Sequence, residues 1–310
     1  MSRRPSPSSS TAVPAARYLI GIDGGGTGTR ARLVDSAGRR LGQGEAGPSA
    51  LGQGVDQAWR NIRQAIDAAF LAAGLTPAAE ADCALGLGLA GAEVATRRER
   101  FLASAPAYCK LALATDAATT LAGAHAGRPG TIVAVGTGTI GLARHADGRE
   151  TSANGWGFPV GDEGSGAWLG LLAMQIAQQA FDGRSAAGAL ARAVWRTAGG
   201  SRAELLAWCE HAGQQRYAEL APLVFETEAD DTQAAALLAA AAQAIEATVV
   251  AIDPRAELPL ALCGSLGRRL EPYLDAATRA RCVKPAGDAI DGALQLVREQ
   301  IRQPLAPGIP

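Results

Sequence analysis

The sequence predicts an α/β protein made of two similar halves. A pattern of strand, Gly/Thr turn and strand occurs twice, over residues 18–35 and 131–148, and apolar strand-like segments alternate with helix-like segments after the first copy. No Pro/Gly-rich linker separates the halves. We therefore expect two domains that share a hinge and a cleft.

The first half begins with the clearer copy of the hairpin. Apolar residues lead from Tyr18 to Asp23, a Gly/Thr turn follows over residues 24–29, and a second apolar strand ends at a turn over residues 35–38. The elements expected next are a strand near Leu41, a helix over 58–70, a strand over 83–89, a helix over 94–103, a strand over 111–114 and a helix over 117–126.

The second half opens with its own hairpin and then becomes mainly helical. We expect helices over 165–181 and within 203–252, a strand over 258–263, and a last helix over 289–301 that could pack on the first domain. The predicted organisation is a disordered tail over 1–17, an N-terminal domain over 18–122 joined by the last helix, and a C-terminal domain over 123–288.

Composition narrows the class of protein. Hydrophobic residues make up 48% of the 310 residues, as in a soluble globular protein, and a formal net charge of −1 gives no electrostatic reason to expect nucleic acid as a partner. The five cysteines form no CxxC pair, and residues 1–17 lack the apolar core of a secretory signal. The apolar run over 234–252 is interrupted by Gln243 and Glu246, which favours a buried helix over a membrane span. We expect a cytoplasmic protein.

The two Gly/Thr turns are candidate phosphate sites. Glycine lets the backbone approach a ligand closely, and successive N–H groups together with Thr hydroxyls can donate to anionic oxygens. Tight hairpins whose glycines only relieve strain are the alternative, but the duplication and the acid before the first turn favour nucleotide binding. The candidate residues are Gly25, Gly26 and Thr27 in the first turn and Gly136, Thr137, Gly138 and Thr139 in the second.

Other nucleotide-binding motifs are excluded or weak. The lysines of the chain, Lys110 and Lys284, follow no glycine loop, which excludes a P-loop enzyme. Residues 86–91 and 136–141 match GxGxxG, but the first segment lacks an acid at the distance of a ribose contact and the second runs into a strand. A nicotinamide enzyme is therefore disfavoured.

Asp116 is the candidate catalytic residue. It follows a short apolar strand and precedes a helix, where α/β sheets place ligand chemistry. It can cap the helix that begins at Ala117 and also accept the proton of an attacking hydroxyl, since an ordinary pKa of about 3.9 leaves it ionised at neutral pH.

Two further glycine-rich segments suggest substrate contacts. In residues 155–166, Asp162 and Glu163 can grip neighbouring hydroxyls of a polyol and Trp156 offers a face to sugar C–H groups, although one of the two acids is expected to cap the helix from Ser165. In the turn after the strand over 258–263, an adenine or ribose could approach the backbone, although left-handed turn chemistry explains these glycines almost as well. The residues of that turn are Gly264, Ser265 and Gly267.

In this order, the motifs resemble the BadF/BadG/BcrA/BcrD ATPase family, and within it the bacterial glucosamine kinase and N-acetylglucosamine kinase branch. The resemblance covers residues 18 to about 298. It implies two ribonuclease H-like domains of the actin and hexokinase type, with ATP and sugar in the cleft between them. It also implies an amino-sugar substrate and allows a homodimer.

Carried over by position, Asp116 matches the catalytic base, and Asp23 matches the acid that engages Mg²⁺ through water. The two Gly/Thr turns match the phosphate loops, and residues 264–267 match the adenosine loop. Trp156, Asp162 and Glu163 fall in the sugar-binding stretch, to which the resemblance adds Gly91. The implied reaction is transfer of the γ-phosphoryl group of ATP to a hydroxyl, the 6-OH, of glucosamine or N-acetylglucosamine.

One departure and two alternatives stay open. Several relatives carry an Asn that touches the sugar soon after the third strand, whereas residues 47–51 read GPSAL here, which leaves free glucosamine or another hexose open. A sugar-responsive regulator that has lost catalysis would need a partner or DNA module, which the sequence lacks. An ATPase that activates a redox partner would need cysteines for an iron–sulfur cluster, and the scattered cysteines argue against it.

Overall fold

The computed structural model describes residues 16–302. They form two compact units: the first takes in the described residues up to Thr119 and those from Ala293 onward, and the second is Thr120–Gly292. The tail predicted over residues 1–17 lies outside the described residues except for its last two. Of these, Arg17 donates its N–H to the carbonyl of Asp82.

The first unit is built on a mixed sheet with the strand order β3–β2–β1–β4–β5. β1, β2 and β3 are antiparallel neighbours, whereas β4 and β5 run parallel to β1. Its elements are β1 (Tyr18–Gly24), β2 (Thr29–Asp35), β3 (Arg40–Ala46), α1 (Val55–Ala72), β4 (Cys83–Leu89), α2 (Ala95–Ala103), β5 (Lys110–Ala114), the start of α3 (Asp116–His125) and most of α12 (Ala289–Arg302).

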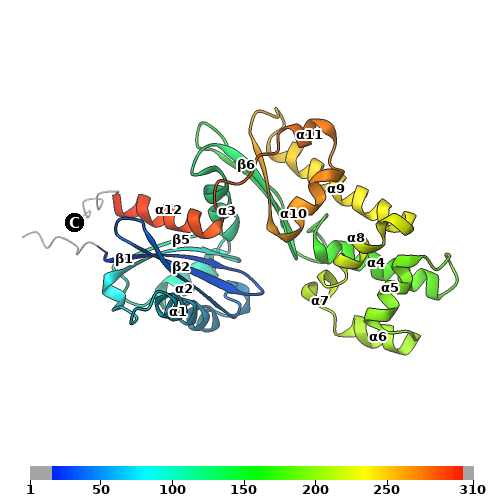
Figure 1. The fold of residues 1–310 in the computed structure, drawn as a ribbon, viewed down its shortest axis with the longest axis horizontal. Coiled ribbons are helices and arrows are strands. Elements are labelled where there is room, and N and C mark those ends of the chain that lie inside the picture. The colour runs from blue at the N-terminus through cyan, green and yellow to red at the C-terminus, as the bar shows by residue number, and fades with distance from the viewer. Residues whose placement is uncertain (1–15, 303–310) are drawn as a thin grey trace, which may run out of the picture. The chain divides into compact units, whose positions relative to one another are not determined.

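Alternating residues of these strands build a core on each face of the sheet. One face packs against α1 and α2, where Trp59 stacks on Phe101 with ring centroids 4.2 Å apart. On the other face, Leu294 and Val297 of α12 pack on strand residues that include Leu19. Figure 1 shows α12, in red, along one side of this sheet and α1 with α2 on the other. The last helix therefore completes the first unit.

Two glycines of β4 make room for helices on the α12 face. A Cβ on Gly86 would lie 1.8 Å from the carbonyl oxygen of Ala293, and a Cβ on Gly88 would lie 2.0 Å from Oγ1 of Thr119 in α3. Both distances are far below van der Waals contact, so only glycine allows this approach. Two of the three glycines in the loose GxGxxG match over residues 86–91 are thus explained by packing.

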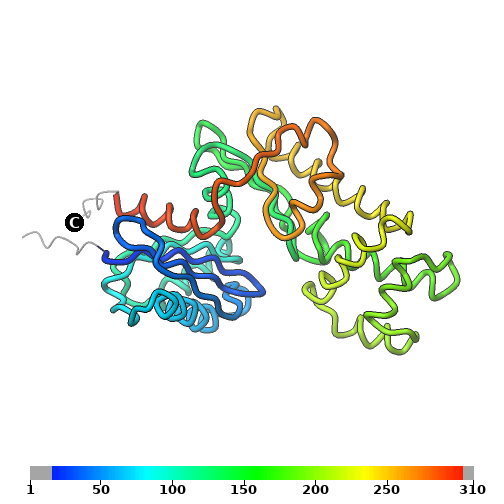
Figure 2. The backbone as a smooth tube through the Cα atoms, in the orientation of Figure 1, coloured from blue at the N-terminus to red at the C-terminus, as the bar shows by residue number. Residues whose placement is uncertain are grey.

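The second unit repeats the plan with the strand order β8–β7–β6–β9. As in the first unit, a hairpin carries a third antiparallel strand on one side and a parallel strand on the other. The backbone trace in Figure 2 follows both hairpins. The elements are β6 (Gly130–Val135), β7 (Thr139–Arg144), β8 (Glu150–Asn154), α4 (Gly166–Phe181), α5 (Ala189–Ala198), α6 (Arg202–Glu210), α7 (Gln214–Ala218), α8 (Ala221–Thr227), α9 (Thr232–Ile252), β9 (Leu260–Cys263), α10 (Gly264–Leu270) and α11 (Ala276–Ala280).

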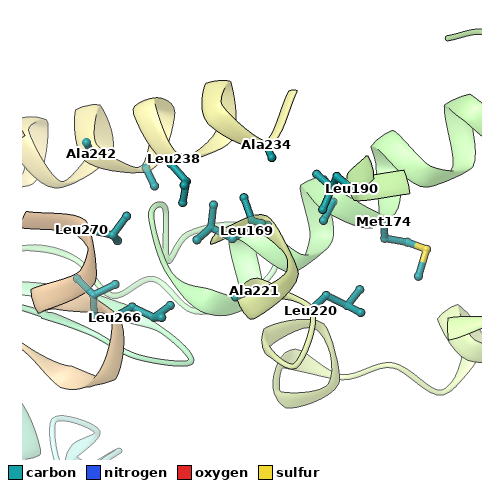
Figure 3. Packing of buried hydrophobic residues seen from close by; sticks show 14 of the residues in the cluster. Leu169, Met174, Leu190, Leu220, Ala221, Ala234, Leu238, Ala242, Leu266 and Leu270 are labelled. Atoms are coloured by element: carbon teal, nitrogen blue, oxygen red, sulfur yellow. The ribbon is translucent and has the colours of Figure 1, made fainter. Parts of the chain in front are cut away.

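The core of the second unit lies between its helices and its sheet. Figure 3 shows Leu169 of α4, Leu190 of α5 and Leu238 of α9 meeting there. By length and composition α9 could cross a membrane, but Leu238 and Ile245 are fully buried in this core. The sequence predicted a buried helix here, and the packing of α9 agrees with it.

Candidate active site

The carboxyl ends of three parallel strands gather acidic residues at one edge of the first sheet. Asp23 of β1 is in register with Gly88 of β4, and Gly88 is in register with Ala114 of β5. Neighbouring strands lie about 4.8 Å apart, so β5 runs about 10 Å from β1. Asp116 follows Ala114 by two residues, and the negative charges of Asp23 and Glu93 both raise its pKa. The three carboxyl groups therefore share one electrostatic environment.

Asp116 is the first residue of α3, and its carboxyl is partly withdrawn from solvent. The helix is capped one residue earlier than predicted, since Oγ1 of Thr115 accepts the N–H of Ala118 at 3.1 Å. Asp116 instead accepts the N–H of Ala117 at 2.9 Å. Burial is the largest influence and raises the pKa of Asp116 to about 6, so the ordinary value assumed from the sequence is wrong. At pH 7 about nine-tenths of such carboxyls are ionised.

Asp23 is paired with an arginine that the sequence argument overlooked. Arg30 lies directly opposite Asp23 in the β1–β2 ladder, and Oδ2 of Asp23 accepts from Nη2 of Arg30 at 2.5 Å. The side chain of Asp23 is 21% exposed and that of Arg30 is 50% exposed. Both line a cavity of about 460 Å³ together with residues of the first turn. The spacing across a hairpin turn was the signal that could have revealed this pair.

The first Gly/Thr turn points its carbonyl groups back into the protein. Gly25 donates its N–H to the carbonyl of Gly28 at 3.0 Å, and its own carbonyl accepts the N–H groups of Ser49 and Ala50, each at 3.1 Å. Nε2 of Gln53 donates to the carbonyl of Gly26 at 3.1 Å. Among the described residues, the N–H groups of Gly26 and Thr27 have no protein acceptor. They remain available to anionic oxygens.

Carbonyl groups of the second turn also accept backbone N–H groups, here from the start of α4. The carbonyl of Gly136 accepts the N–H of Gly166 at 2.8 Å, and the carbonyl of Thr137 accepts that of Ala167 at 3.1 Å. Within residues 16–302, the N–H groups of Thr137 and Gly138 have no protein acceptor. In both turns, carbonyl groups accept N–H groups from a later segment, but the first turn has four residues between its strands and the second has three.

The predicted adenosine loop adjoins the second turn. Gly264 has a φ of +81°, and a Cβ there would lie 2.3 Å from the carbonyl oxygen of Val135, so this position requires glycine. Ser265 is exposed and Gly267 is buried against Leu262. These residues begin α10 and do not form a separate turn.

The predicted sugar-binding residues in the loop over residues 155–165 differ in their exposure to solvent. Trp156 is 85% exposed and Glu163 is exposed, whereas Asp162 is only 4% exposed. Ser165 caps α4 by accepting the N–H of Trp168 at 3.1 Å, so the expectation that Asp162 or Glu163 caps this helix is wrong.

The carboxylate of Asp162 is bound by a protein donor. Nε2 of Gln214 donates to its Oδ2 at 2.7 Å, and the nearby backbone N–H groups of Thr139 and Gly157 act to lower its pKa. Burial raises the pKa of Asp162 and these groups oppose the shift. A contact between Asp162 and sugar remains a prediction.

Gly91 and residues 47–51 are the parts of the first unit that the sequence linked to sugar recognition. Gly91 has a φ of +86° in the loop after β4 and lies close to the N–H of Gly52. In the GPSAL segment, Ser49 is fully buried and its Oγ accepts the hydroxyl of Thr29 at 2.7 Å. Asn61 reaches this segment from α1, but its amide donates to the carbonyl of Pro48. Residues 47–51 themselves contain no asparagine.

The fold and the paired turns define an α/β protein of the hexokinase and actin-like ATPase class. A hexokinase of the ROK type from Thermus thermophilus shares this fold at a TM-score of 0.51 and 20% identity, over 92% of this chain and all of that one. The predicted fold class, with two ribonuclease H-like halves, is therefore confirmed.

The family follows from a closer match. The model of the BadF/BadG/BcrA/BcrD ATPase family matches residues 20–265, and this chain belongs to that family. It is 33% identical to the glucosamine kinase GspK of Vibrio cholerae over 89% of this chain and 94% of that one. It is 48% identical to a protein of Chromobacterium violaceum provisionally described as an N-acetylglucosamine kinase, whose crystal structure matches at a TM-score of 0.90 over 92% of this chain and all of that one.

Proposed function

We propose that this protein is a cytoplasmic, ATP-dependent amino-sugar kinase that phosphorylates the 6-OH of glucosamine or N-acetylglucosamine. The observation that carries the proposal is the carboxyl of Asp116, with a pKa of about 6, at the sheet edge that also bears the first Gly/Thr turn. The names given to the two similar kinases support an amino sugar as acceptor.

In this reaction Asp116 orients the acceptor hydroxyl and takes its proton. A carboxylate is a sufficient base, because phosphoryl transfer passes through a loose transition state in which the proton leaves late. The available N–H groups of both turns bind phosphate oxygens, and residues 264–267 receive the adenosine. Trp156 offers an exposed face to the sugar and Glu163 binds hydroxyls.

Mg²⁺ fits the residues of the first turn. The described residues contain no group of three or more His, Cys, Asp or Glu side chains that could hold a metal by themselves. Mg²⁺ needs no such cage, because it keeps several waters and is usually bound through one or two carboxylates and the phosphates of the substrate. Asp23, which lines the cavity beside the turn, is the oxygen donor we assign to it. A bound Mg²⁺ neutralises charge on the β and γ phosphate oxygens.

The test is ADP release from Mg-ATP with glucosamine, N-acetylglucosamine, glucose and N-acetylmannosamine. Release that depends on an amino sugar supports the kinase, and NMR of the product identifies the hydroxyl that carries phosphate. Release without sugar would favour an ATPase that activates a partner. No release with any sugar, from protein that binds ADP, would favour a regulator without catalysis.

A further inference from the structure

The carboxylate of Asp162 lies between two segments to which the proposed function gives different ligands. Its Oδ2 packs against Gly138 of the second Gly/Thr turn, and its backbone N–H is tied to Asn154 at the start of the loop that carries Trp156. Its side-chain donor, Gln214, comes from α7, 52 residues further along the chain. Asp162 is only 4% exposed, so the loss of the Gln214 donor would leave a desolvated acceptor, which holds the two side chains together.

The surroundings of Gly138 show how closely Asp162 and Gln214 pack against the second Gly/Thr turn. A Cβ on Gly138 would lie 2.8 Å from Oδ2 of Asp162 and 3.2 Å from Nε2 of Gln214. Asp162 and Gln214 therefore pack directly against the backbone of the turn at Gly138. A change in the position of the turn must move the carboxylate or lengthen its hydrogen bonds.

The same carboxylate is tied to the loop of Trp156 by further contacts. Oδ1 of Asn154 accepts the N–H of Asp162 at 3.0 Å, and Gly161 donates its N–H to the carbonyl of Gly157 at 2.8 Å. Gly161 also packs on Trp156, since a Cβ there would lie 2.7 Å from the Trp156 Cβ. A short path of contacts thus joins the turn, Asp162 and the backbone of Trp156.

We propose that Gln214 is a positioning residue that holds Asp162 as a link between the second Gly/Thr turn and the loop of Trp156, so that nucleotide on the turn orders the sugar-facing loop. This inference rests on the proposed function, because it takes the turn as a nucleotide site. Gln214 touches neither substrate in this scheme and acts through Asp162. The coupling would favour binding of ATP and sugar together.

The first measurement is hydrogen–deuterium exchange with and without ADP, which needs no catalysis. In the natural protein, ADP should slow exchange over both 136–139 and 155–163. In Gln214→Leu, the protection over 155–163 should be lost while that over 136–139 remains. The control is Gln215→Leu, which removes the same amide from the neighbouring exposed position of α7 and should behave as the natural protein.

The second measurement uses Gln214→Glu, which keeps the size of the side chain. When the new carboxyl is protonated it can donate to Asp162, whereas the ionised form repels it, so kcat/KM should fall about tenfold at pH 8 and recover toward the natural value as the pH is lowered. Glu163, in the same loop, carries the negative charge that acts on Asp162 and raises its pKa. On α7, Arg216 lies over Trp208, and the first turn of α4 carries no acid.

The outcomes separate this inference from the proposed function. Protection of 136–139 by ADP together with unchanged protection of 155–163 in Gln214→Leu would overturn the coupling and leave the kinase intact. Equal pH profiles for Gln214→Glu and the natural protein would overturn it as well. Absence of any ADP protection at 136–139 in the natural protein would refute nucleotide binding at the turn, and the coupling with it.

Discussion

Replacing Asp116 by Asn tests the proposed base with little disturbance of the fold. Asn is nearly isosteric, and its Oδ1 can still accept the N–H of Ala117, so α3 should begin at the same residue. The amide cannot accept the proton of the acceptor hydroxyl. A general base contributes about 10² to 10⁴-fold to the rate, so turnover should fall by that factor while ADP and sugar still bind.

The pH dependence of kcat/KM in the natural protein is a second test of Asp116 as the base. With a pKa of about 6, Asp116 is the active ionised base above pH 6, and activity is lost as the pH falls through that value. At pH 5 about one-tenth of the carboxyls are ionised, so kcat/KM should be about a tenth of its plateau. An ordinary aspartate would give no such loss until below pH 4.

The effect of Glu93 on the pKa of Asp116 can be tested in the same pH profile of kcat/KM. Its negative charge raises the pKa of Asp116, so Glu93→Gln should move the acid limb of kcat/KM to lower pH without abolishing turnover. The assay is coupled ADP release from pH 4.5 to 8 with saturating ATP. Turnover of Asp116→Asn within tenfold of the natural enzyme, or an acid limb unmoved by Glu93→Gln, would refute the reasoning.

Two further substitutions test the supports of the second unit. Gly138→Ala places a methyl group 2.8 Å from Oδ2 of Asp162 and should weaken ADP binding about tenfold by calorimetry, whereas Gly200→Ala, which meets open space, should bind ADP normally. Arg281→Met removes the ion pair of Asp253, whose side chain is 2% exposed, and should lower the free energy of unfolding by about 2 kcal/mol in urea. Equal stability of that variant and the natural protein would show that the backbone donors of Leu258 and Glu257 suffice for Asp253.

Local patterns in the sequence predicted much of this molecule. The two hairpins follow from Gly/Thr turns between apolar strands, and the position of Asp116 follows from a strand that ends just before a helix. The carbonyl-inward conformation of both turns also fits a cradle of N–H groups. These features depend on neighbouring residues, which a reader of the sequence can see together.

Features that depend on distant contacts were missed. The pKa of Asp116 depends on burial and on charges from two other strand ends, so its residue type alone could not reveal it. The partner of Asp162 is Gln214, and no local pattern joins residues 52 positions apart. Gly86 and Gly88 suggest a ligand in the sequence, yet they serve helices that arrive from later in the chain.

The docking of α12 on the first unit sets an order of events during synthesis. The whole second unit leaves the ribosome before Leu294 and Val297 do, so the apolar strip on β1, β2, β4 and β5 stays uncovered until translation is nearly finished. A chain that stops after residue 292 would contain the whole second unit and a first unit whose apolar strip is exposed to solvent. Proteins shortened at this end should therefore aggregate even though every residue of both Gly/Thr turns is present.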